Sequence, residues 1–240
     1  MAQKKRTRKE KKVEVISTHL GLDFKINERY ALTDKQKQLI SLAQRDDTKI
    51  VVCDGPAGTS KTYISVYIAL NMLKQKRIDQ ILYIRSIVES ASKKLGSLPG
   101  EVDEKFKPWS IPLLEKCDEF IGMSMTNSLI DGEFIHCVPV NYLRGSTFRN
   151  SVVIVDEAQN LEMSEIITIL TRFGHNCKMF VIGDSLQSDI QKTCFKRMCE
   201  VFKGEDSKQQ GIHCFAFNNE DIVRDELLKF IVKKMPELKM

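Results

Sequence analysis

Short apolar runs recur along the chain and predict buried β-strands. Val152–Asp156 (VVIVD) is typical, because its first four residues are all apolar instead of alternating with polar ones. Consecutive apolar residues indicate parallel strands that helices cover on both faces. The pattern predicts strands at Lys49–Asp54, Gln80–Arg85, Phe134–Val138, Val152–Asp156, Lys178–Gly183 and Ile212–Phe217.

Between these runs, apolar residues return at the spacing of an α-helix. Helices are predicted at Asp34–Gln44, Lys61–Lys74, Lys107–Met123, Met163–Phe173, Gln191–Phe202 and Glu220–Lys234. Alternating strands and helices predict an α/β fold with a mostly parallel sheet, helices on both faces and ligands at the carboxyl ends of the strands. The stretch 86–108 has no clear periodicity, so we expect a long loop there, of a kind that is usually functional or mobile.

Charge divides the chain into two parts. The net charge is +5, but residues 1–12 carry seven basic residues and one acidic residue, which leaves residues 13–240 at −1. We therefore expect a basic, disordered tail and lead-in over residues 1–30, and one domain over 31–240, a length that suits a single core. The tail either keeps the protein in solution or grasps nucleic acid.

Cysteine usage and hydropathy indicate the compartment. The seven cysteines are scattered without a C-x-x-C pair, which indicates reduced thiols and argues against a zinc site. No apolar run is long enough to span a bilayer, and no apolar stretch of a signal peptide follows the basic tail. We therefore expect a cytoplasmic protein, in a bacterial or phage-infected cell, with no membrane partner.

A glycine-rich segment, GPAGTSKT at residues 55–62, lies between a predicted strand and a predicted helix. It fits the phosphate-loop pattern G-x-x-x-x-G-K-[ST] except at Ser60, which replaces a glycine. We expect its backbone N–H groups to wrap a β-phosphate, Lys61 to neutralise phosphate oxygens and Thr62 to bind Mg²⁺. A left-handed backbone at Ser60 would cost about 1–2 kcal/mol, which charged phosphate contacts can offset. The alternative is a plain glycine turn.

Two further strands end in polar residues that suit ATP hydrolysis. Asp156 follows an apolar strand and is placed to hold Mg²⁺, while the adjacent Glu157 is placed to orient and polarise the attacking water. Gln187, after the strand that ends at Gly183, is placed to contact the γ-phosphate or this water. Taken singly, each of these is also an ordinary turn or helix-cap signal.

In this order, the motifs resemble those of PhoH-like ATPases, relatives of the superfamily 1 helicase core. The resemblance covers roughly residues 33–235. It includes GPAGTSKTY at 55–63, LGSLPG at 95–100, DEAQN at 156–160 and YLRG at 142–145, of which the second and fourth are specific to the family. The nucleotide-binding residues that it implies are Gly55, Pro56, Ala57, Gly58, Thr59, Ser60, Lys61, Thr62 and Tyr63.

The resemblance implies a single RecA-like P-loop NTPase domain that hydrolyses ATP with Mg²⁺, is linked to RNA and assembles into a homo-oligomeric ring, with a hexamer favoured. It does not extend to the nuclease domains of longer members. Gln36 resembles the glutamine with which such motors read adenine, although a surface glutamine is an equal alternative. Ser86 departs from the proline that usually follows the family's arginine, which affects the loop after Arg85.

Arginines supply the remaining candidates. A single motor core needs a finger from a neighbouring subunit, and Arg224 and Arg172 are the candidates, with a plain surface salt bridge as the alternative for each. Arg85 and Arg144, with nearby lysines, are expected to contact single-stranded nucleic acid, RNA in preference to DNA. Two other functions stay open: a small-molecule kinase, and an ATP-responsive binding protein with little turnover.

Overall fold

The computed structural model describes residues 23–28, 32–85, 102–143, 145–187, 194–223 and 225–234, with only the backbone described for 102–108 and 141. The expectations for the basic tail, for the LGSLPG segment, and for Arg144 and Arg224 therefore lie outside the described residues. Within the described part of the chain, no helix is long and apolar enough to cross a membrane.

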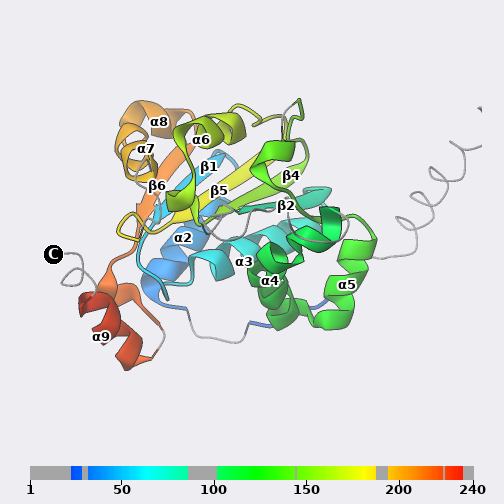
Figure 1. Ribbon diagram of the computed structural model, residues 1–240, viewed down its shortest axis with the longest axis horizontal. Helices are drawn as coiled ribbons and strands as arrows, with labels where there is room; N and C mark the ends of the chain where they lie inside the picture. Colours follow the sequence, from blue (N-terminus) through cyan, green and yellow to red (C-terminus); the bar gives the residue numbers. More distant parts are fainter. Residues whose placement is uncertain are drawn as a thin grey trace, which may run out of the picture.

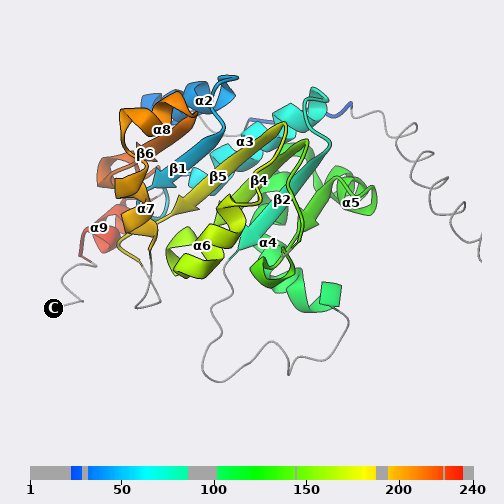
Figure 2. The same cartoon turned by 90° about the horizontal axis from the view of Figure 1, so that it is seen from above.

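Six parallel strands form one sheet in the order β3-β2-β4-β5-β1-β6. All six predicted strands are confirmed to within one residue at each end. The sheet is entirely parallel, as Figures 1 and 2 show, where the prediction was a mostly parallel one. The strands are β1 (Ile50–Asp54), β2 (Gln80–Arg85), β3 (Ile135–Cys137), β4 (Ser151–Asp156), β5 (Cys177–Gly183) and β6 (Ile212–Ala216).

Helices cover both faces of the sheet. One apolar core joins the sheet to α2 (Asp34–Gln44), α3 (Lys61–Lys74), α4 (Val102–Ile121) and α5 (Met123–Asp131). A second core joins its other face to α6 (Met163–Leu170) and α7 (Phe195–Val201). Figure 2 shows α2 and α3 on one side of the sheet and α6 on the other. Successive residues of β1 point to opposite cores, Val51 to the first and Val52 to the second, which is why the strand is apolar throughout.

Several helices differ from the prediction. The helix predicted at Lys107–Met123 begins earlier, at Val102, and ends before Gly122, whose φ of 79° breaks it and separates α5. A short helix, α8 (Glu205–Gln209), was not predicted. The helix predicted at Glu220–Lys234 is wrong in its first part, because the single turn η4 (Asn219–Asp221) precedes α9 (Glu226–Lys234). The remaining short turns are η2 (Val140–Tyr142) and η3 (Ala158–Asn160).

Candidate nucleotide-binding site

The glycine-rich loop joins the end of β1 to the beginning of α3. Its first residue, Gly55, lies so close to β6 that an added Cβ would approach the Cβ of Phe217 to 2.7 Å, so no other residue fits without a shift. Ser60 stands where the phosphate-loop pattern has a glycine. Its backbone is left-handed, with φ 68° and ψ 25°, and it caps α3 without a side-chain hydrogen bond. The departure from glycine therefore falls where a side chain is strained.

The ammonium group of Lys61 folds back into this loop. It donates hydrogen bonds to the carbonyl oxygens of Gly55, at 2.5 Å, and Pro56, at 2.9 Å. The Thr59 hydroxyl donates to the same Pro56 oxygen at 2.9 Å and stiffens the loop. A cation held by two carbonyls of a glycine-rich loop, at the beginning of a helix, lies where a phosphate group would bind.

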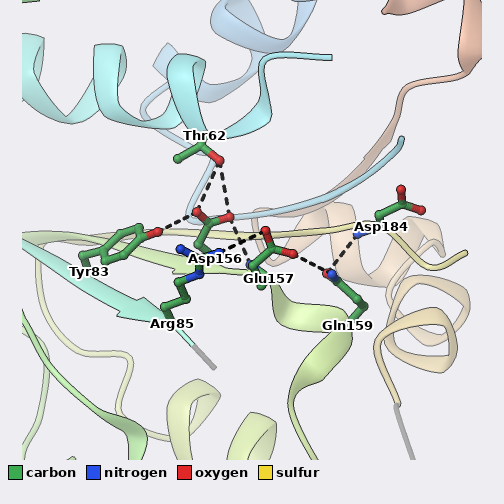
Figure 3. A network of polar contacts seen from close by, with 7 residues as sticks. All are labelled: Thr62, Tyr83, Arg85, Asp156, Glu157, Gln159 and Asp184. Carbon is green, nitrogen blue, oxygen red and sulfur yellow. Dashed lines mark hydrogen bonds and ion pairs between the residues drawn. The ribbon is translucent and has the colours of Figure 1, made fainter. Parts of the chain in front are cut away.

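The carboxylate of Asp156 lies at the end of β4 and faces the loop (Figure 3). The Thr62 hydroxyl lies 3.3 Å from each of its oxygens, and the Tyr83 hydroxyl donates to it at 2.6 Å from β2. Burial raises the pKa of the Asp156 carboxyl above its ordinary value, while the hydrogen bond from Tyr83 opposes the shift. Burial also raises the pKa of Tyr83, so its phenol stays protonated and donates.

Thr62 and Asp156 fit a magnesium ion. Adjacent oxygen ligands of octahedral Mg²⁺, with bonds of about 2.1 Å, lie about 3 Å apart. The hydroxyl-to-carboxylate distance of 3.3 Å is close to that edge, and both oxygens are of the hard type that Mg²⁺ prefers. These two residues, both expected as ligands, are therefore able to hold the ion together.

Glu157 is held by contacts on two sides of its carboxylate (Figure 3). Arg85, at the end of β2, lies 3.5 Å from one oxygen, and the Gln159 amide donates to the other at 2.6 Å. The same Gln159 side chain accepts from the backbone N–H of Asp184 at 3.1 Å, so it connects β4 to the end of β5. The backbone of Glu157 is left-handed, with φ 52°, which turns its side chain away from the strand direction.

One cleft of about 930 Å³ contains these groups, and it lies at the carboxyl ends of the strands. Its lining includes the expected residues Gln36, Ala57, Gly58, Ser60, Lys61, Thr62, Tyr63, Arg85, Asp156, Glu157 and Gln187. Gln36 is only 2% exposed and donates to the Thr59 carbonyl at 3.4 Å, so it is not a surface glutamine. Arg172 is not part of the lining of the cleft. It follows α6 and lies near the beginning of β5, at the amino ends of the strands.

Comparison with known proteins identifies the family of the chain. The family model described as PhoH-like protein matches residues 30–236. The chain belongs to the PhoH family. The PhoH-like protein of Synechocystis is 35% identical over 206 residues, which are 85% of this chain and 61% of that protein.

Two other PhoH relatives give similar values. The PhoH-like protein of Bacillus subtilis is 35% identical over 201 residues, and Protein PhoH of Escherichia coli 33% over 199 residues. The chain spans 55–61% of the length of these PhoH proteins. The crystal structure of Pif1 helicase from Candida albicans aligns with 79% of this chain and 40% of its own, with a TM-score of 0.36 and 14% identity, too weak a likeness to carry an argument.

Sequence reasoning missed three contributors to the PhoH site. Tyr83 was read only as part of an apolar strand, although its hydroxyl is a polar group in a run that is otherwise buried. Gln159 was read as part of a motif, without a role of its own. Asp54 accepts from the backbone and side chain of Ser185, at 2.9 and 2.7 Å, and so ties β1 to the loop after β5. The sequence does contain a signal for Asp54, because it is a polar residue at the end of a predicted strand.

Proposed function

We propose that the chain is a Mg²⁺-dependent ATP hydrolase that acts together with single-stranded nucleic acid, RNA in preference to DNA. The observation that carries this proposal is one cleft that brings the ammonium of Lys61, the Thr62–Asp156 pair and the carboxylate of Glu157 together. Membership of the PhoH family, whose model covers the glycine-rich loop and both acids, supports a nucleotide-binding role for the chain.

Each residue has a role that its position supports. Lys61, released from the loop carbonyls, neutralises the β- and γ-phosphate oxygens, and the loop N–H groups hold the β-phosphate. Thr62 and Asp156 hold Mg²⁺, which supplies positive charge to the phosphate oxygens when it is bound. Glu157 orients the attacking water, and Gln187 contacts the γ-phosphate from the end of β5. Gln36 and Tyr63 lie beside the loop, where an adenine would be read.

Two variants test hydrolysis directly. Glu157→Gln should bind ATP with unchanged affinity but lose most of its turnover, because the carboxylate proposed to orient water is lost while Lys61, Thr62 and Asp156 remain. Lys61→Ala should lose nucleotide binding. A Glu157→Gln variant that turns over like the wild type contradicts the proposal, and a wild type with no turnover favours an ATP-responsive binding protein. A phosphorylated acceptor in a product assay favours a kinase.

Arg85 supports a link between nucleic acid and hydrolysis. Its guanidinium is partly exposed, at 27% of the side chain, and it lies 3.5 Å from the water-orienting Glu157. A strand phosphate that engages Arg85 would compete with this ion pair and release the carboxylate. We therefore expect single-stranded RNA to raise the ATPase rate, with an affinity that falls with salt at a slope of about −0.7 for each phosphate contact.

Arg85→Gln tests this link. Basal ATPase activity should change as well, because Arg85 lines the cleft and contacts Glu157. The measurement is therefore the ratio of the RNA-stimulated rate to the basal rate, which should fall towards one in this variant. Arg45→Gln is a matched control. Arg45 is exposed and pairs with Asp47 at 2.6 Å, and it precedes β1, away from the carboxyl ends of the strands where the cleft lies. Equal stimulation of wild type and Arg85→Gln would contradict the role of Arg85.

We also propose a homo-oligomeric ring, with a hexamer favoured. Arg172 follows α6 and lies near the amino end of β5, whereas the cleft lies at the carboxyl ends. An arginine so placed is able to serve only the site of another subunit. Arg172 is partly exposed, although its Nε is buried and has no hydrogen-bond partner among the described residues.

A further inference from the structure

A second cavity, of about 510 Å³, lies at the amino ends of the strands, on the opposite side of the sheet from the carboxyl ends, where the nucleotide cleft lies. Most of its lining comes from segments that precede strands: Asp46, Thr48 and Lys49 before β1, Arg77 before β2, and residues 173–176 before β5. We call it the basal pocket, and its lining is Asp46, Thr48, Lys49, Met72, Arg77, Phe173, Gly174, His175, Asn176, Cys177 and Lys178. The proposed hydrolysis assigns no role to these residues.

The charge of the basal pocket is positive. Lys49, Arg77 and Lys178 line it with one acid, Asp46. The Arg77–Asp46 ion pair, at 2.7 Å, is exposed, with 41% and 92% of the two side chains accessible. Exposed pairs of this kind contribute little to stability, so an anion is able to take the place of Asp46 on the guanidinium.

Two donors in the wall of the pocket are buried and incompletely used. Lys178 is 6% exposed and donates to the Ala43 and Arg45 carbonyls, at 2.5 and 2.9 Å, which uses two of its three N–H groups. Thr48 is 1% exposed, and its hydroxyl has no hydrogen-bond partner among the residues that the structure describes. Both residues line the pocket, and buried donors are rarely left unpaired, so each is a candidate donor to an acceptor bound there.

The basal pocket has room for an acceptor larger than a water molecule. A water occupies about 30 Å³ in the liquid, a small part of this pocket. A phosphate group presents three oxygens to several donors at once, which suits a guanidinium, an ammonium and a hydroxyl better than the two oxygens of a carboxylate do. We propose that the basal pocket binds a phosphate-bearing anion, at a site separate from the glycine-rich loop.

Calorimetric titration with pyrophosphate tests this site in the full chain. The background is Lys61→Ala, which disables the loop so that the remaining binding belongs to the basal pocket. We expect one bound pyrophosphate in this background. Adding Arg77→Gln should weaken it about 10-fold or more, because a bond between charged groups is lost. Adding Thr48→Val should weaken it about 3- to 10-fold, and adding Lys76→Gln, a neighbour outside the pocket, should leave it unchanged.

Thermal unfolding of Thr48→Val separates binding from folding. The substitution removes a buried, unpaired hydroxyl and keeps the shape of the side chain, so the midpoint should stay the same or rise. Lost affinity together with an unchanged midpoint supports the site. Competition of AMP and of a single-stranded oligonucleotide against pyrophosphate then distinguishes a free nucleotide from a strand phosphate as the source of the group.

Three results would overturn the basal site. Lys61→Ala binds no pyrophosphate; or it binds with an affinity that Thr48→Val and Arg77→Gln both leave unchanged; or binding is so weak that only an adventitious ion is involved. None of these results bears on hydrolysis in the cleft, since the proposed ATPase does not use the basal pocket.

Discussion

Left-handed backbone occurs at two residues other than glycine in the cleft, Ser60 and Glu157, and each caps the helical turn that follows it. Residues other than glycine avoid this conformation because Cβ approaches the following carbonyl. The strain persists at these positions because flanking contacts hold the backbone, and strained residues cluster where ligands are bound. The Ser60 strain was foreseen from the pattern; that of Glu157 was not, because no sequence rule places an acid there.

Ser60→Gly tests the strain in the loop. Relief of about 1–2 kcal/mol is partly offset by the greater freedom of glycine in the unfolded chain, about 0.4–1 kcal/mol, which leaves a net gain of about 0.5–1 kcal/mol. Urea denaturation measures it. Ser60→Ala is the control, since it keeps Cβ and the strain; a Ser60→Gly protein no more stable than Ser60→Ala would contradict this account.

Gln159 is a positioning residue for Glu157. It donates to that carboxylate at 2.6 Å and accepts from the Asp184 N–H at 3.1 Å, while it is 2% exposed. Gln159→Leu should keep nucleotide affinity and lower turnover about 10- to 100-fold, since small displacements of a catalytic group have effects of this size. The split between kcat and KM in steady-state kinetics measures it.

Gly183→Ala provides an independent perturbation of the same contact. A Cβ at Gly183 would approach the Gln159 Oε1 to 2.8 Å, so the amide has to move. We expect a reduced kcat in the same direction as for Gln159→Leu. If both variants turn over ATP at the wild-type rate, Gln159 has only a structural role.

At the scale of elements, the strands were predicted well and the helix boundaries less well. The strands are buried on both faces, so β4 and β5 are apolar nearly throughout and their ends coincide with turn residues. Helix ends depend on local backbone conformation, as at Gly122, and on caps such as Asn218, which binds the Glu220 N–H at 2.9 Å. Sequence periodicity contains neither. The positions of the glycine-rich loop and of the acids were predicted because each follows a strand. The contacts of Tyr83 and Gln159 depend on which strand ends lie side by side, which the sequence pattern does not show.

The buried cation of β5 caps the end of α2. Lys178 donates to the carbonyls of Ala43 and Arg45, which a helix end leaves without partners. Burial, the largest cause, and the charge of Arg77 together lower the pKa of Lys178 to about 8, whereas Asp46 and Asp47 oppose the shift. The charged form is therefore disfavoured in the folded protein relative to the unfolded chain.

This shift predicts a pH dependence of stability. Between pH 8 and about 10.4, the ordinary lysine value, the unfolded chain binds more protons at this position than the folded protein. The free energy of unfolding of the wild type should thus rise relative to that of Lys178→Met as pH increases through this window, by about 1–3 kcal/mol. Urea denaturation at pH 7.5 and 9.5 measures the difference; equal pH dependence of the two proteins would contradict it.

At the scale of the whole molecule, the proposed ring predicts complementation between inactive variants. Lys61→Ala lacks the phosphate-binding lysine and Arg172→Ala lacks the candidate finger, so each should be nearly inactive alone. Mixed rings contain interfaces that combine an intact Lys61 with an intact Arg172, and activity should return on mixing. Light scattering gives the assembly mass in parallel. A monomeric mass at micromolar concentration with full ATPase activity would contradict the ring.

Complementation also distinguishes the two finger candidates. If mixing Lys61→Ala with Arg172→Ala restores nothing while each variant still forms the assembly, Arg224 becomes the candidate to replace. A wild-type rate for Arg172→Ala alone would show that this residue is not the finger.

The position of β1 has a consequence for synthesis on the ribosome. This strand, which leads into the phosphate loop, pairs with β5 on one side and with β6 on the other, in registers such as Ile50↔Met179 and Ile50↔Ile212. Both partners are translated more than a hundred residues later, so a nascent chain exposes two open strand edges through most of its elongation. The glycine-rich loop reaches its final surroundings only when Phe217 packs against Gly55, so the early emergence of β1 is the stage at which a chaperone would matter most.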